Sequence, residues 1–146
     1  MSIERQAAWL FRVNAATNWL LALPAIVSPL AAAALYGGPP PNYPAVIRVW
    51  AGLVFMFGCM FFETSRDVVG KRHLIKYNWI EKSITAGAIT LGYLSGDVPA
   101  RLMTLIVLTN WLWIPAIAWY DVAVRRAAGQ RAAGPPRDLA TAAPGG

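Results

Sequence analysis

The amino-acid sequence predicts an all-α polytopic membrane protein, a bundle of four transmembrane helices with both termini in the cytoplasm. Three observations lead to this prediction. Hydrophobic residues make up 57% of the chain and charged residues only 14%, whereas about 25% of the residues in a soluble domain are charged. The apolar residues form four runs, each close to the 20 residues that a helix needs to cross a bilayer. The lysines and arginines gather on one side of the resulting topology.

The four predicted spans cover residues 7–35, 45–62, 75–94 and 100–122. The first and the fourth contain a full span without charge, the second carries Arg48 near its start, and the third carries Glu81 and Lys82 in its first two turns. Helices are favoured over strands because the runs are long and rich in Ala, Leu and Met, whereas a transmembrane barrel is built from alternating segments of about ten residues.

The connecting segments agree with these boundaries. Residues 36–44 are rich in Gly and Pro and uncharged, 63–76 are polar, and 95–99 form a short turn with Gly and Pro. Residues 127–146 are rich in Ala, Gly and Pro without apolar periodicity, which predicts a disordered cytoplasmic tail behind a transmembrane domain of residues 1–126.

The orientation follows from the basic residues. With four spans, ten of the thirteen lysines and arginines fall on one side: Arg5, Arg12, Arg66, Lys71, Arg72, Lys76, Arg125, Arg126, Arg131 and Arg137. The positive-inside rule then places both termini and the middle loop in the cytoplasm. A cleaved signal peptide is the alternative, with residues 20–30 as its apolar region and 31–34 as its cleavage site. It is less favoured because its charged region would be unusually long.

Ionisable groups at membrane depth carry the most functional information, because they need partners. Asn78, Glu81, Lys82 and Thr85 follow helical spacing and form one polar stripe on the third span. One interpretation is a charged site that faces the bundle interior. The other, which the sequence slightly favours, is that Lys82 extends to the membrane interface and Glu81 pairs with it or with Arg72.

Polar residues on the other spans can complete a cluster with this stripe. The candidates in the cytoplasmic half of the bundle are Asn14, Asn18, Glu63, Glu81, Lys82, Asn110 and Asp121. The asparagines have an alternative role as structural hydrogen-bonding residues between helices. Trp111 and Trp113 flank Asn110 and could form the walls of a pocket for a flat apolar ligand such as an isoprenoid or quinone, although ordinary packing is favoured for them.

No cofactor and no metal site are predicted. His73 is the only histidine, and Cys59 is the only cysteine; Cys59 is expected to be a small apolar core residue. The net charge of +6 is explained by topology and by contact with anionic lipids rather than by nucleic acid. The expected partners are therefore membrane lipids, together with another membrane protein or an apolar small molecule.

Part of the chain resembles a loose group of bacterial four-helix membrane proteins, often described as DoxX-like. The similar segments are residues 47–52, 57–58, 65–67, 77–82 and 92–96, continuing to Asn110. Arg48 and Gly52 match the start of the second helix, Asp67 the aspartate that follows it, and Lys82 the lysine early in the third helix. Asn110 stands where an acid is expected. The resemblance implies a four-helix fold in the bacterial cytoplasmic (inner) membrane.

Three classes of function remain. The leading one is an accessory or binding subunit that acts through helix contacts in the bilayer, because the sequence lacks a complete catalytic set. The alternative is a lipid- or isoprenoid-binding protein or enzyme that uses the polar cluster around Glu81 and Lys82. A small proton-coupled transporter is the weakest, because the first span has no carboxylate in its apolar body and no inverted repeat is present.

Overall fold

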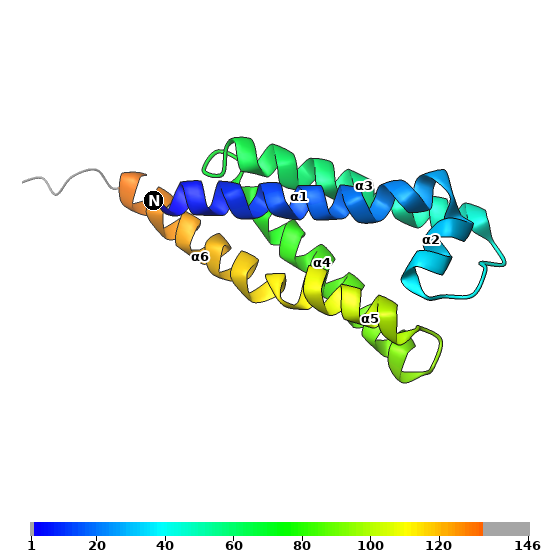
Figure 1. The fold of residues 1–146 in the computed structure, drawn as a ribbon. Coiled ribbons are helices and arrows are strands. Elements are labelled where there is room, and N and C mark those ends of the chain that lie inside the picture. Colours follow the sequence, from blue (N-terminus) through cyan, green and yellow to red (C-terminus); the bar gives the residue numbers. More distant parts are fainter. Residues whose placement is uncertain (1, 133–146) are drawn as a thin grey trace, which may run out of the picture.

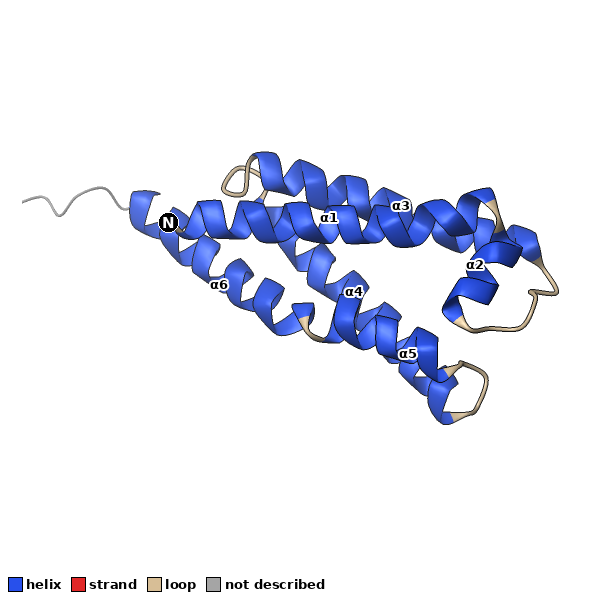
Figure 2. Ribbon diagram, viewed as in Figure 1, coloured by secondary structure: helices blue, strands red, loops and turns tan. Residues whose placement is uncertain are grey.

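The computed structural model describes residues 2–132, and every regular element in that range is a helix (Figures 1 and 2). The elements are α1 (Ile3–Val27), α2 (Pro29–Tyr36), α3 (Pro44–Arg66), α4 (Arg72–Leu94), α5 (Ala100–Ile106), the π-helical turn η1 (Val107–Trp111) and α6 (Trp113–Ala132). The all-α prediction is confirmed.

Three helices are long and apolar enough to cross a membrane: Ile3–Val27, Pro44–Arg66 and the continuous rod Ala100–Gln130. Helix α4 is as long as α3, with 23 residues in each. It is more polar, because Glu81 and Lys82 interrupt its apolar residues. Three of the four predicted spans therefore have the length and the apolar composition of a membrane span.

The helices form two pairs that diverge from a common end (Figure 1). Helix α1 lies along α3, and α4 lies along the rod of α5, η1 and α6. The chain begins at the common end, which also holds residues 67–71 and the end of α6; we call it the termini end. The opposite end, called the far end, holds α2, residues 37–43 and residues 95–99.

The first predicted span, 7–35, is divided into two helices rather than continuous. Ser28 is extended, with φ −138° and ψ 91°, and its side chain accepts a hydrogen bond from the backbone N–H of Ala31 to begin α2. Pro29 follows at the first position of α2, where its missing N–H costs nothing. The Tyr36 hydroxyl then donates to the Leu21 carbonyl at 2.6 Å, which attaches the end of α2 to α1.

The last helix continues further than predicted. Helix α6 runs to Ala132, so the expectation of disorder is wrong for residues 127–132, where Ala, Gln and Arg favour a helix. The remainder of the predicted tail, 133–146, lies outside the described residues.

The rod also contains the π-helical turn η1, in which the backbone N–H of Leu112 donates to the Val107 carbonyl at 3.1 Å. A π-helical turn adds one residue to the helical turn and so shifts the faces of the residues beyond it.

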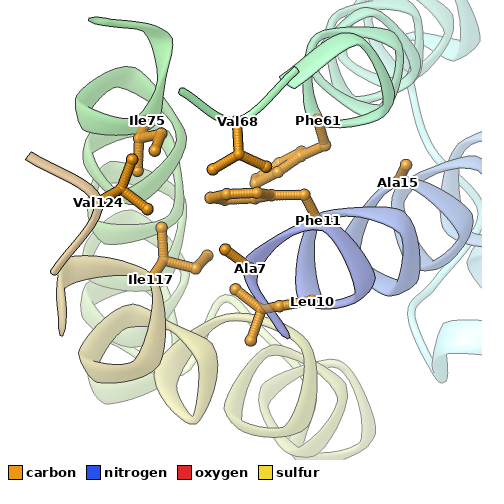
Figure 3. Close-up of a cluster of buried hydrophobic side chains, with 9 residues drawn as sticks. All are labelled: Ala7, Leu10, Phe11, Ala15, Phe61, Val68, Ile75, Ile117 and Val124. Carbon is orange, nitrogen blue, oxygen red and sulfur yellow. The ribbon is translucent and has the colours of Figure 1, made fainter. Parts of the chain in front are cut away.

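An apolar cluster fills the termini end of the bundle (Figure 3). It consists of Ala7, Leu10, Phe11, Ala15, Phe61, Val68, Ile75, Ile117 and Val124, contributed by four helices and the 67–71 connection. The rings of Phe11 and Phe61 lie with their centroids 6.2 Å apart. We call this cluster the apolar seal.

Candidate functional site: a buried polar cluster beside a small cavity

The polar stripe of α4 faces the interior of the bundle. Asn78 is 0% exposed, Lys82 1% and Glu81 9%. The alternative in which Lys82 extends to the membrane interface is therefore wrong. Helical spacing places these side chains on one face of α4, and this face packs on the neighbouring helices. The other side of α4 carries exposed apolar residues such as Ile84 and Leu91.

Lys82 is held by the pair of helices opposite its own. Its ammonium donates to Asn18 Oδ1 on α1 at 3.0 Å and lies 5.2 Å from the centroid of the Phe61 ring on α3. Asn18 in turn donates to the Val54 carbonyl at 3.5 Å. Lys82 thus links three helices, through a charge-assisted hydrogen bond and a cation–π contact. It makes no ion pair with Glu81 in the described part of the chain.

Glu81 has one satisfied oxygen and one without a partner. Oε1 accepts a hydrogen bond from the Thr85 hydroxyl at 3.2 Å. Oε2 is buried, and no group among residues 2–132 donates to it. A buried acceptor without a donor costs about 1–3 kcal/mol, and more if it is charged. The carboxylate therefore offers an acceptor for a hydrogen-bond donor that comes from outside the described residues.

Two asparagines, one helical turn closer to the termini end, also have buried polar atoms without a hydrogen-bond partner in the described range. Asn14 donates to the Leu10 carbonyl of its own helix at 3.0 Å, while its Oδ1 has no partner in the described range. The two polar side-chain atoms of Asn78, Oδ1 and Nδ2, are also buried without a partner in that range. The alternative role expected for the asparagines was hydrogen bonding between helices. Asn18 has this role, because its hydrogen bonds link α1 to Val54 on α3 and to Lys82 on α4.

A small cavity adjoins Glu81 on the side away from the apolar seal. Its polar lining comes from Asn18, Glu81, Thr85 and Asn110, and its apolar walls include Tyr36, Trp50 and Leu102. The space open to the centre of a water molecule is about 20 Å³, which is enough for about one water molecule. We call this space the inner cavity. It joins residues of α1, α2, α3, α4, α5 and η1, and three of the seven residues of the predicted cluster, Asn18, Glu81 and Asn110, line it.

Asn110 reaches the inner cavity from the π-helical turn. It is buried, and its Nδ2 donates to the Thr109 hydroxyl at 3.0 Å. An asparagine amide has two N–H donors, so one remains for a ligand.

Two acids of the predicted cluster do not join it. Glu63 lies on the surface and forms ion pairs with Arg66 at 3.3 Å and with Lys71. Met56 and Cys59, which lie on the same side of α3 as Glu63, are exposed as well. The expected core position of Cys59 is therefore wrong. Asp121 is buried, but it pairs with Arg125 at 2.7 Å on its own helix and does not line the inner cavity.

The tryptophans of the site differ from those predicted. Trp111 is 44% exposed and donates to the Thr90 hydroxyl at 3.1 Å, and the half-buried Trp113 donates to the Leu108 carbonyl at 2.9 Å. Neither lines the inner cavity, whereas Trp50 does. Trp50 shares the interior face of α3 with Val54, four residues later, and this spacing is the signal that could have identified it.

No family model, curated protein or solved structure matches this chain. Within residues 2–132, no three side chains of His, Cys, Asp or Glu gather as ligands for a metal ion. The site therefore offers hydrogen bonding and charge: one carboxylate, one buried ammonium beside it, two carboxamides and a hydroxyl.

Proposed function

We propose that this chain is a four-span membrane protein that binds a small, largely apolar molecule through a polar end seated at Glu81. One observation carries the proposal. A buried carboxylate oxygen, Glu81 Oε2, has no donor within the described chain and belongs to a residue that lines an otherwise mostly apolar cavity. Ligand pockets typically combine apolar walls with a few polar groups that fix the orientation of the ligand.

The proposal includes α4 as the fourth span. Its 23 residues correspond to about 34 Å of helix, which exceeds the roughly 30 Å of the hydrocarbon core. Its two mid-helix charges are turned inward, and polar residues inside a membrane protein usually face the bundle interior. The side that remains for lipid carries apolar residues such as Ile84 and Leu91.

The proposed orientation has both termini in the cytoplasm of a bacterial inner membrane. The termini end of the bundle carries Arg5, Arg12, Arg125 and Arg126, together with the Arg66–Arg72 segment. The positive-inside rule supports a cytoplasmic location for this end. The far end then faces the outer leaflet. The inner cavity lies on the side of Glu81 that is nearer to that leaflet.

Ligand binding is favoured over catalysis because of the groups that meet at the inner cavity. Asn18, Thr85 and Asn110 can orient a polar group, but Lys82 is already engaged by Asn18 and Phe61. The cavity contains a single carboxylate, whereas general acid–base catalysis needs groups placed to move a proton at a reacting atom.

The test is a lipid extract of the purified protein, read by mass spectrometry. We expect one apolar compound to co-purify with the wild type and with the control Glu63→Gln, whose carboxylate lies on the surface. Glu81→Gln should lose most of that compound, because the amide is a weaker acceptor and introduces donors of its own. Equal retention by all three proteins, or stoichiometric recovery of another membrane protein with no enriched compound, would contradict the proposal; the latter would favour an accessory subunit.

A further inference from the structure

A second, larger cavity lies at the far end of the molecule. Its lining comes from α2, α3 and the 37–43 connection on one side and from α4, α5 and the 95–99 connection on the other. Its volume is about 430 Å³, within the range of about 300–1,000 Å³ that is typical of ligand pockets. Its lining is mainly apolar and includes Ala33, Ile89 and Val98. We call it the far-end pocket.

The far-end pocket and the inner cavity share three residues of their walls. Tyr36, Trp50 and Leu102 line both. The two spaces are therefore neighbours along these side chains, with Glu81 at the inner one. On its other side the inner cavity is bounded by the Lys82–Asn18 contact, and beyond it lies the apolar seal. The far-end pocket is thus one approach to Glu81 on the side away from the apolar seal.

The sizes of the two cavities divide the ligand into two parts. The inner cavity, at about 20 Å³, holds about one water-sized group. The far-end pocket is about twenty times larger and mainly apolar. A ligand that fits both has a polar end of a single small group and a hydrocarbon body.

The charges at the inner cavity select a neutral polar end. Glu81 and Lys82 are adjacent, buried and of opposite charge, so they balance each other. A cationic ligand would leave a net positive charge in a medium where uncompensated charge is expensive. A carboxylate ligand would present acceptors to Glu81 Oε2, which itself needs a donor. A hydroxyl donates one hydrogen bond and accepts another, and it can accept from the remaining N–H of Asn110.

We propose that the far-end pocket holds the hydrocarbon chain of a neutral, single-chain lipid alcohol whose hydroxyl donates a hydrogen bond to Glu81 Oε2. This inference rests on the proposed function and adds the chemical class of the ligand and the location of its chain. The hydrocarbon chain follows from the mainly apolar lining of the pocket, and the hydroxyl follows from the unpartnered carboxylate oxygen.

The test measures binding of two ligands to the full chain in nanodiscs. The probes are radiolabelled hexadecan-1-ol and hexadecyl methyl ether, which keeps the chain and the oxygen but cannot donate a hydrogen bond. We expect the alcohol to bind at least tenfold more tightly than the ether. We also expect Ala33→Trp, which fills the far-end pocket, to weaken alcohol binding at least tenfold. Ala34→Trp is the matched control, since Ala34 is the next residue of α2 and is exposed.

A second pair of variants guards against misfolding of Ala33→Trp. Ile89→Trp fills the same pocket from α4, and Leu91→Trp is its control on the exposed side of that helix. If folded Ala33→Trp and Ile89→Trp bind the alcohol like the wild type while Glu81→Gln does not, the far-end pocket is not the chain site and the proposed function stands. If the alcohol and the ether bind equally and Glu81→Gln changes nothing, both proposals are overturned. If only the alcohol preference is absent, the hydroxyl assignment is wrong.

Discussion

Replacing Lys82 by Met removes a buried ammonium while keeping a flexible side chain of similar length. The substitution affects two groups directly. Asn18 Oδ1 loses the donor that lies 3.0 Å away, and the Phe61 ring loses a cation 5.2 Å from its centroid. Glu81, which is 9% exposed, loses the neighbouring positive charge that compensates it.

The expected loss of stability can be worked out from these contacts. A buried acceptor left without a partner costs about 1–3 kcal/mol, and a desolvated cation–π contact contributes about 1–2 kcal/mol. Removing one member of a buried charge pair costs about 3–5 kcal/mol. We take about 3 kcal/mol, the lower end, because Met also avoids the desolvation of an ammonium and because Glu81 and Lys82 form no direct ion pair in the described chain.

The assay is the free energy of unfolding in mixed micelles, followed by circular dichroism during titration with a denaturing detergent. The control is Lys76→Met on the exposed side of the same helix, for which we expect a change within about 0.5 kcal/mol. Adding Glu81→Gln to Lys82→Met should recover part of the loss, because it removes the stranded charge. Glu63→Gln and Asp121→Asn should not, because those acids pair with Arg66 and Arg125. A Lys82→Met protein as stable as the wild type would show that the contacts of Lys82 with Asn18 and Phe61 do not stabilise the fold.

Two further predictions concern packing and topology. Gly58→Ala should lower the free energy of unfolding by about 1–3 kcal/mol, because the new Cβ would lie 2.6 Å from Trp19 Nε1; a neutral result in the same detergent titration would show that α1 and α3 are not closely packed there. Gly52→Ala, on the same helix with nothing within 4 Å of its new Cβ, should instead gain up to about 1 kcal/mol. Reporter fusions after Arg126 should read cytoplasmic and fusions within 37–43 external, whereas matching readings at both positions would exclude four spans.

The sequence predicts best what local spacing determines. Asn78, Glu81 and Lys82 form one inward face because three- and four-residue spacing places side chains on one side of a helix wherever that helix packs. The inward position of Asn18 follows from the same rule. The all-α class follows from run length and composition alone.

The interior face of α3 could not be predicted in this way. Its residues are apolar on nearly all sides, and lipid tails are as apolar as a protein core, so hydrophobicity does not distinguish the lipid-facing side from the buried one. The polar cue, Glu63, pointed to the wrong side because it pairs with Lys71 beyond the helix end. Trp50, on the correct side, was therefore missed as a wall of the site.

The breaks in the helices also could not be predicted from the hydrophobic runs alone. The division at Ser28 depends on a serine cap and a following proline. In the sequence these two residues lie within a long uncharged apolar run, which favours one continuous helix. The π-helical turn before Trp113 changes which residues of the rod face inward. Within the turn itself, Trp111 is exposed while Asn110 beside it is buried.

Infrared difference spectroscopy tests the role of Glu81 most directly, because it reports the hydrogen bonding of the carboxyl group itself. Hexadecan-1-ol added to the protein in nanodiscs should shift a carboxyl or carboxylate band that is present in the wild type and in Glu63→Gln and absent from Glu81→Gln. Hexadecyl methyl ether should leave the band in place, because it has no hydrogen to donate. A saturating amount of the alcohol that leaves the Glu81 band unshifted, or the same shift in Glu81→Gln, would contradict a ligand hydroxyl at Glu81.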